Sequence, residues 1–532
     1  MKVIQDDIDR KHQKIPTHNG LQEESFVGQF SEAQSKGLKS LPQHKQVAKE
    51  SCSLKGMWTV FLRKIGTAMY IRRRSYYWLH LAFWAFMCLI MSAFVYASGR
   101  KKDLSYIDSL YYAASATSAT GLMSTDFSKE GGGTQILVFL MMLVSGAVFE
   151  SMIPIMLRIW RLKQTGESYT VSIKQSEVYI ILGVITFYWF ILQLFGFLIL
   201  GFYIQFSEAG STVMETNNVN AWWWSIFQTV SSFNNCGFSL LSDSLVQFNT
   251  QIFVLILCGG LILLGNTAYP VFLRATLRLI DTIFYQRFPS LSKSCRLILD
   301  NPRSYTTHLF PSHSTWALVV VLFLVNGLQS IRVMSHNYHA PAFDCLSAGY
   351  MEANAIFQSI SVRTAGLNSI NIATFNIESL VLMIMLMYVS AYPITITIRS
   401  TNTSVEKSHC HKTTVDQLRR LLMQDVMWIC APWYLICAIE GYDTSSEGFI
   451  VLFEVVSAYG TVGLSLGLSC CSYSFSGSWS VPSKLIIILV MLLGRHRGMP
   501  DNLDSAILLD FNRDFAEITS RSSLSRDSRP SN

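Results

Sequence analysis

Four short segments of the sequence could bring backbone carbonyl oxygens to an ion. Each is rich in small and hydroxyl side chains, and each ends in a glycine that an apolar residue follows. The segments are SLYYAASATSATGL (109–122), SIFQTVSSFNNCGF (225–238), AIFQSISVRTAGL (355–367) and VLFEVVSAYGTVGL (451–464). Glycine allows a backbone turn that a Cβ atom would oppose. Because carbonyl oxygens that face one space can replace the hydration shell of an alkali cation, the four copies indicate a repeated ion site.

Each segment begins with about two and a half turns of plausible helix, which is too short to cross a membrane. The chain must therefore enter the membrane and return to the same side. Irregular backbone at that depth is tolerated only where it lines a water-filled path or is buried in protein. The short helices would direct their negative C-terminal ends at the common axis, which favours a cation. The alternative is four interfacial loops in an unrelated transporter.

Long apolar runs flank these segments. Half of the 532 residues are hydrophobic and 14% are charged, against roughly 25% charged in soluble domains. This composition excludes a disordered chain, a coiled coil and a typical soluble enzyme. The runs cover residues 78–97, 135–160, 178–204, 251–279, 315–333, 379–398, 421–439 and 484–493. All but the last can span a hydrocarbon core of about 30 Å.

Two runs with one glycine segment between them form a unit that occurs four times. We therefore predict an all-α membrane bundle of eight transmembrane helices in four span–pore loop–span repeats. The repeats would surround a central pore with pseudo-fourfold symmetry. Their predicted bounds are 70–165, 170–300, 310–405 and 415–511.

Lys and Arg clusters fall on one side of the membrane if both termini are cytoplasmic, which also accounts for the net charge of +7 without a nucleic-acid partner. The polar stretches 1–56 and 512–532 are predicted to be disordered cytoplasmic tails. We expect a multi-pass protein of the plasma membrane. Neither metal-ligand spacing of Cys and His nor a dinucleotide-binding motif occurs, so no cofactor is expected.

Four motifs resemble the Trk/HKT/Ktr superfamily of potassium and sodium transporters: SSFNNCGF (231–238), GNTAYPVFLR (265–274), SAYGTVGLS (457–465) and GRHRGMPDNLD (494–504). The last motif looks like the fungal Trk branch, whereas the lack of a long polar insert after the second run looks like compact HKT proteins. The resemblance implies a homodimer in the lipid bilayer, with a pore in each protomer. Bacterial relatives need a nucleotide-binding subunit, and no such domain is evident here.

The resemblance also implies that the loop glycines line a selectivity filter that holds K⁺. With the residue before each glycine, the predicted filter is Thr120, Gly121, Cys236, Gly237, Ala365, Gly366, Val462 and Gly463. In HKT proteins, serine at the first position goes with Na⁺ preference and glycine with K⁺ permeation. Gly121 therefore favours K⁺ uptake, driven by membrane potential or ion coupling, with Na⁺ as a candidate second cargo. The alternative is a Na⁺-selective or Na⁺–K⁺ cotransporting HKT-like protein.

Two arginines, Arg495 and Arg497, fall near mid-membrane in the short last run. A charge at this depth is costly and usually functional. They are either a fixed positive charge that limits cation occupancy or gates the pore, or half of a structural salt bridge with a buried acid. Glu150 could pair with Arg495, but we expect it near the inner interface because Arg158 follows about two turns later. Residues 389–398 are a gating candidate.

Polar residues near the glycines are predicted to support the filter. Glu454 stands where the second segment has Gln228, so we expect it to accept hydrogen bonds behind the filter rather than to attract cations. Asn234 and Asn235 could offer oxygens to the ion, but bracing the loop is the commoner role. Arg363 is expected to brace the third loop, because a cation beside the path would repel K⁺.

Other classes of protein fit the sequence less well. An enzyme would need a catalytic cluster within the spans, and the acidic residues there are few and isolated. A receptor would not need four matching loops. A non-conducting homologue is disfavoured by the glycine at the end of all four segments.

Overall fold

The computed structural model describes residues 76–99, 104–165, 175–338, 340–344, 346–389, 393–394, 397–398, 414–442, 445–468 and 472–497. All of them belong to one unit, Arg73–Asn532. The predicted tails, 1–56 and 512–532, lie outside these residues, as does half of the gating candidate at 389–398.

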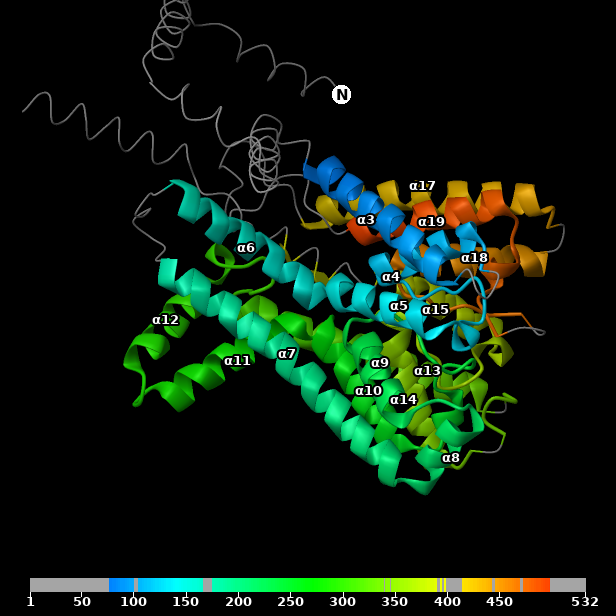
Figure 1. The fold of residues 1–532 in the computed structure, drawn as a ribbon, viewed down its shortest axis with the longest axis horizontal. Coiled ribbons are helices and arrows are strands. Elements are labelled where there is room, and N and C mark those ends of the chain that lie inside the picture. Colours follow the sequence, from blue (N-terminus) through cyan, green and yellow to red (C-terminus); the bar gives the residue numbers. More distant parts are fainter. Residues whose placement is uncertain are drawn as a thin grey trace, which may run out of the picture. The chain divides into compact units, whose positions relative to one another are not determined.

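The described part of the chain is helical and contains no strands (Figure 1). Its α-helices are α3 (Tyr76–Gly99), α4 (Tyr106–Ser118), α5 (Gly132–Ser145), α6 (Ala147–Thr165), α7 (Gln175–Phe206), α8 (Glu208–Thr216), α9 (Ala221–Phe233), α10 (Ile252–Gly265), α11 (Tyr269–Phe284), α12 (Pro289–Asp300), α13 (Ser312–Asn337), α14 (Ala348–Thr364), α15 (Ile377–Val389), α17 (Thr414–Glu440), α18 (Ser445–Gly460) and α19 (Val481–His496).

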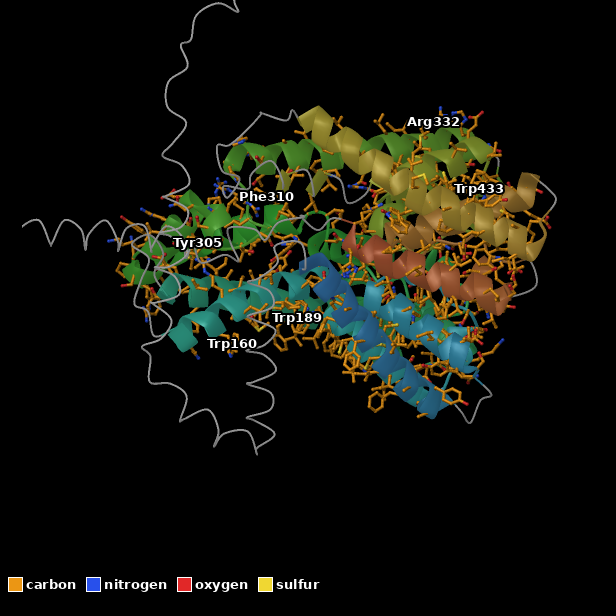
Figure 2. All side chains as sticks on the ribbon, turned by 90° about the horizontal axis from the view of Figure 1, so that it is seen from above. Trp160, Trp189, Tyr305, Phe310, Arg332 and Trp433 are labelled. Atoms are coloured by element: carbon orange, nitrogen blue, oxygen red, sulfur yellow. The ribbon has the colours of Figure 1, made fainter. Side chains whose placement is uncertain are left out.

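Several helices are suited to a membrane. Within the described residues, α3, α7 and α13 are each long and apolar enough to cross one, and the pairs α5–α6 and α10–α11 raise the number to five if each pair is one span. Their outer surfaces are apolar: Phe86 and Phe187 are each 60% exposed and Phe323 is 74% exposed. Figure 2 shows side chains projecting outward along α3, drawn in blue. Such surfaces are expected where lipid covers the protein.

Two of the predicted apolar runs are not single helices. The run at 135–160 bends by 60° between α5 and α6, and the run at 251–279 bends by 84° between α10 and α11. A Cβ atom on Gly146, at the first bend, would lie 1.9 Å from the Asn234 side-chain oxygen. A Cβ atom on Gly265, at the second, would lie 1.6 Å from the Phe233 carbonyl oxygen. The end of α9 thus packs directly against both bends, where only glycine fits.

The helices before the four glycines are longer than predicted. α4 and α9 have 13 residues each, α18 has 16 and α14 has 17, which is about three and a half turns or more. Side-chain caps begin the first two. The Ser105 hydroxyl accepts from the Asp108 amide, and the Asn220 side chain accepts from the amides of Trp222 and Trp223.

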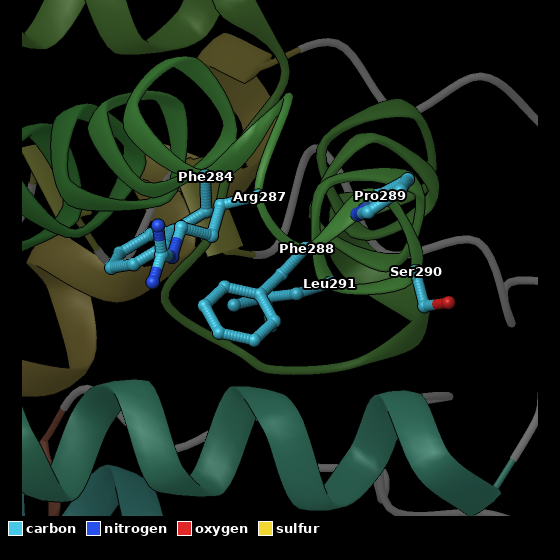
Figure 3. Close-up of a pocket in the computed structure, with 6 residues that line it drawn as sticks. All are labelled: Phe284, Arg287, Phe288, Pro289, Ser290 and Leu291. Carbon is cyan, nitrogen blue, oxygen red and sulfur yellow. The ribbon is translucent and has the colours of Figure 1, made fainter.

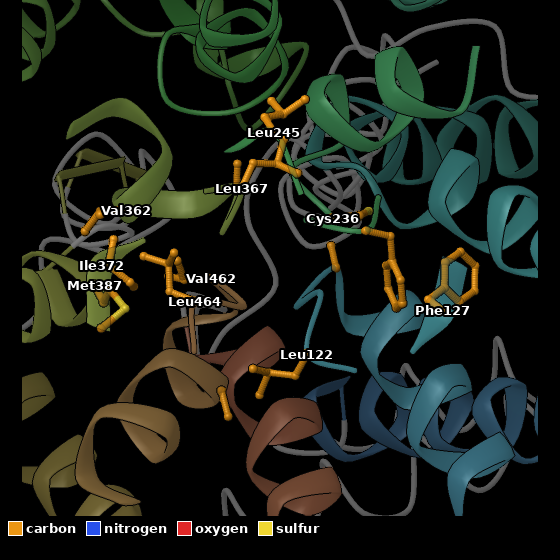
Figure 4. Close-up of a cluster of buried hydrophobic side chains, with 14 of the residues drawn as sticks. Leu122, Phe127, Cys236, Leu245, Val362, Leu367, Ile372, Met387, Val462 and Leu464 are labelled. Atoms are coloured by element: carbon orange, nitrogen blue, oxygen red, sulfur yellow. The ribbon is translucent and has the colours of Figure 1, made fainter. Parts of the chain in front are cut away.

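The buried apolar residues form two clusters. The larger surrounds the four glycine segments, and Figure 4 shows part of it. The smaller lies among α6, α7, α11 and α12. There, α11 and α12 form a hairpin whose turn has a shallow pocket (Figure 3), lined by Phe284, Arg287, Phe288, Pro289, Ser290 and Leu291.

Candidate functional site

Each of the four segments ends in a turn that requires glycine. The φ angles are +88° at Gly121, +77° at Gly237, +66° at Gly366 and +90° at Gly463. Residues with a side chain rarely adopt this left-handed region. The glycines stand two to four residues after the ends of α4, α9, α14 and α18, so each reverses the chain at the C-terminal end of a short helix.

The four turns face one another in a closed cycle. A Cβ atom added to each glycine would contact a carbonyl oxygen of the neighbouring turn. That oxygen belongs to the residue directly before the next glycine of the cycle. These distances are 2.2 Å from Gly121 to Cys236, 2.6 Å from Gly237 to Ala365, 2.1 Å from Gly366 to Val462, and 1.9 Å from Gly463 to Thr120. Figure 4 shows Leu122, Cys236, Leu367 and Leu464 around this region. The structure therefore brings all eight predicted filter residues together.

This arrangement has the polarity of a cation site. The C-terminal ends of four helices meet at the cycle, and each carries a partial negative charge of roughly half an elementary charge. Carbonyl oxygens supply further negative potential. Among the described residues, no cluster of three His, Cys, Asp or Glu side chains could hold a resident metal ion.

Serine side chains brace three of the turns. The Ser115 hydroxyl accepts from the Gly121 amide at 3.0 Å, and the hydroxyls of Ser231 and Ser361 donate to the carbonyls of Phe238 and Leu367 at 2.6 and 2.7 Å. These residues were not predicted. A signal was present, because a serine stands six residues before the glycine in three segments and five before it in the shorter third segment.

Both asparagines of the second loop make hydrogen bonds to neighbouring elements. The Asn234 amide nitrogen donates to the Gln193 side chain on α7 at 3.3 Å. The Asn235 nitrogen donates to the Ile262 carbonyl on α10 at 3.1 Å, and its oxygen accepts from the Thr364 hydroxyl of the third loop at 2.6 Å. These contacts fit the predicted bracing role, while the Asn234 side-chain oxygen has no hydrogen-bond partner.

Glu454 is fully buried on α18 and holds the segment that follows the fourth loop. Its Oε1 accepts from the backbone amide of Ser476 at 3.1 Å and from the Ser476 hydroxyl at 2.7 Å. The same hydroxyl is 2.6 Å from the Tyr111 hydroxyl on α4, so the network joins the fourth segment to the first. At the corresponding position of the first segment, the Tyr112 hydroxyl donates to the Thr125 carbonyl at 2.8 Å.

The two arginines at the end of α19 are both engaged. Arg495 forms an ion pair with Glu150 at 2.8 Å and donates to the Ser145 carbonyl. Arg497 donates to the Tyr388 carbonyl at 3.0 Å. Of the two interpretations of Glu150, the structure therefore shows the pair with Arg495. Glu150 stands in the first turn of α6, directly after the 60° bend at Gly146.

Arg363 is in the last turn of α14 and is 5% exposed. Its Nη1 atom has no hydrogen-bond partner. The Nη1 atom therefore makes no hydrogen bond that would brace the third loop, which is the role predicted for Arg363 from the sequence.

Taken together, the bent apolar helices and the converging loops define a multi-pass helical membrane protein with a candidate cation site. A family model described as "TrkH: Cation transport protein" matches residues 161–515, which are 355 of the 532 residues. The chain belongs to this TrkH family of cation transport proteins, a family of transporters rather than enzymes. The predicted membership of the Trk/HKT/Ktr superfamily is confirmed. The first glycine segment lies outside the matched range.

The chain is also similar to named fungal proteins. It is 36% identical over 342 residues to potassium transport protein 1 of Schizosaccharomyces pombe, covering 62% of this chain and 40% of that protein. It is 34% identical over 360 residues to potassium transporter TRK1 of Candida albicans, covering 64% of this chain and 34% of that protein. The chain thus matches less than half the length of these two relatives.

A solved structure is similar in fold. It is the crystal structure of the potassium transporter TrkH from Vibrio parahaemolyticus, with a TM-score of 0.50 and 14% sequence identity. The match covers 80% of this chain and 83% of that chain. At this identity the likeness concerns the fold alone, and the fold is that of TrkH.

Proposed function

We propose that this protein takes up K⁺ across the plasma membrane through a filter formed by the four glycine turns. The closed cycle of glycines and preceding carbonyls carries the proposal. The fungal relatives named potassium transporters support K⁺ as the cargo. Gly121 supports it further, because the resemblance associates glycine at this position with K⁺ permeation.

Transport would follow from the polarity of the site. A hydrated K⁺ ion would exchange its water for the carbonyl oxygens of residues such as Thr120 and Val462. The C-terminal ends of α4, α9, α14 and α18 would stabilise its charge. Membrane potential supplies about 2.3 kcal/mol per 100 mV for a unit charge, which supports roughly fifty-fold accumulation.

The architecture that serves this function is part of the proposal. We infer eight spans in four repeats with pseudo-fourfold symmetry, both termini in the cytoplasm, and a homodimer with one pore per protomer. No cofactor and no obligatory nucleotide-binding subunit are needed. Na⁺ is a second candidate cargo, and sodium selectivity is the alternative outcome of the test below.

The test is growth rescue and ion uptake in cells that lack their own K⁺ uptake, at low external K⁺ with and without Na⁺. Gly237→Arg should abolish rescue because a side chain there meets the Ala365 carbonyl. Gly132→Arg is the matched control, since nothing lies within 4 Å of a Cβ atom there. Both variants are compared at equal surface expression.

Rescue by the wild type and by Gly132→Arg, lost in Gly237→Arg, supports K⁺ conduction through the loops. Entry of Na⁺ without rescue moves the protein to the sodium-carrying branch. A well-expressed surface protein that moves neither ion overturns the proposal.

A further inference from the structure

The cycle of glycine turns is surrounded by four similar helix ends, and one of them carries a fixed charge. Three residues before each glycine stand Ser118, Asn234, Arg363 and Gly460. Within their last turns, α4, α9 and α18 have no basic residue, whereas α14 has Arg363. The charge around the site is therefore not fourfold symmetric.

Arg363 is an unusual cation for a buried position. Buried arginines normally pair with a carboxylate or give most of their donors to acceptors. Arg158 and Arg274, for example, each donate to a backbone carbonyl, those of Ser304 and Phe310. Arg363 is 5% exposed, and in the described part of the chain no carboxylate pairs with it and its Nη1 atom has no acceptor. Its charge is therefore not neutralised locally.

The charge is close to the predicted ion path. Residues three apart on a helix have Cβ atoms about 5–6 Å apart, and an arginine side chain extends roughly 6–7 Å. The guanidinium therefore lies within roughly 12–13 Å of Gly366, whichever way the side chain points. A buried charge at this distance is poorly screened by salt, and its energy with an ion scales with the charge of that ion.

We propose that Arg363 determines valence specificity, by lowering the affinity of the filter for divalent cations more than for K⁺. The inference rests on the proposed function only in taking the glycine cycle as the ion site. Because the repulsion doubles for a divalent ion, the factor by which Arg363 weakens divalent binding is the square of the factor for K⁺. This relation does not depend on the exact distance or dielectric constant.

The negative ends of the four pore helices explain why such a device is needed. They attract a divalent ion twice as strongly as K⁺. A tightly held divalent ion would leave the site slowly and block it, because conduction requires binding that is weak enough to release the ion. One positive charge among the four helix ends offsets this preference.

The test measures ion binding to the purified full chain, titrating KCl and BaCl₂ separately by calorimetry. The variants are Arg363→Gln, which removes the charge, and Arg363→Lys, which keeps it. Arg287→Gln, at the exposed turn of the α11–α12 hairpin, is the control for an equal change of net charge. Melting temperatures identify any variant that does not fold.

We expect Arg363→Gln to raise K⁺ affinity by roughly threefold to tenfold and Ba²⁺ affinity by the square of that factor, about tenfold to a hundredfold. Arg363→Lys and Arg287→Gln should bind both ions as the wild type does. If Arg363→Gln misfolds, Arg363→Met supplies the neutral variant.

The inference would be overturned in favour of a structural role if Arg363→Gln changed the affinity for both ions by the same factor or changed neither. It would also be overturned if Arg363→Lys changed the two affinities as much as Arg363→Gln does. A neutral variant that still binds no Ba²⁺ would also overturn it. Because binding is measured without transport, a protein that binds ions as expected but fails to rescue growth would refute only the proposed function.

Discussion

Replacing the glycines of the cycle by alanine, one at a time, tests the geometry most directly. A Cβ atom would stand 1.9 Å from a carbonyl oxygen at Gly463, 2.1 Å at Gly366, 2.2 Å at Gly121 and 2.6 Å at Gly237. Real Cβ atoms essentially never approach a heavy atom within 3.0 Å. Each alanine must therefore displace a carbonyl oxygen of the cycle.

The required displacements differ. In Gly463→Ala, the distance from the Cβ atom to the Thr120 carbonyl oxygen must grow from 1.9 Å to 3.0 Å, a displacement of 1.1 Å. In Gly237→Ala, the distance to the Ala365 carbonyl oxygen must grow only from 2.6 Å to 3.0 Å, a displacement of 0.4 Å. Strain rises roughly with the square of displacement, so its cost is about seven to eight times larger in the first variant. Both variants also pay about 1–2 kcal/mol for a left-handed alanine.

The assay is K⁺ uptake at equal surface expression, with the melting temperature of the purified protein as a second readout. Transport should fall most in Gly463→Ala, by at least about tenfold, since 1.4 kcal/mol suffices for that factor. Gly237→Ala should be the mildest of the four. Gly260→Ala is the control, because a Cβ atom at this α10 position meets nothing within 4 Å.

Three results would refute the reasoning. The first is wild-type uptake in Gly463→Ala. The second is a loss in Gly260→Ala equal to that in Gly463→Ala. The third is an inverted order, with Gly237→Ala the most severe, which would show that the carbonyl contacts do not control the site.

The remaining predictions concern the filter and its support. Gly121→Ser should shift permeability towards Na⁺, and unchanged reversal potentials in mixed Na⁺ and K⁺ would contradict this role for the glycine. Arg495→Gln and Glu150→Gln should each lower stability by about 2 kcal/mol or more, because each leaves its partner uncompensated. In thermal unfolding, the double variant should lose less stability than the two single variants lose together. Strictly additive losses would count against the ion pair. Glu454→Gln should have a melting temperature within a few degrees of the wild type, because an acceptor for Ser476 remains. Glu454→Leu should lose about 1–3 kcal/mol of stability. Equal melting temperatures for the two variants would argue against the network.

Much of this protein could be predicted from local features of its sequence. The apolar composition and the length of the runs predicted a helical membrane protein, because burial in lipid depends on a stretch of about 20 residues. The four glycine segments were evident because a left-handed turn has a local residue requirement. The motifs around them placed the chain in its superfamily, which the family model confirms.

The bends could not be predicted in the same way. Gly146 and Gly265 occur within apolar runs that continue on both sides, and hydropathy does not distinguish a bent pair from one straight span. The bends coincide with the packing of Asn234 and Phe233 against these glycines. Asn234 is 88 residues from Gly146 in the chain. Such contacts exist only once the helices have packed.

The partners of the buried charges were likewise decided by the tertiary structure. Arg495 and Glu150 were recognised as candidates for a pair, but their 345-residue separation left the choice open until the packed helices placed them 2.8 Å apart. The cyclic order of the glycines and the unneutralised charge of Arg363 also depend on how four distant segments meet. The sequence by itself determined which residues can form the turns, since that is a property of each backbone position. Only the tertiary structure decided which carbonyl each turn faces, because that depends on contacts between distant parts of the chain.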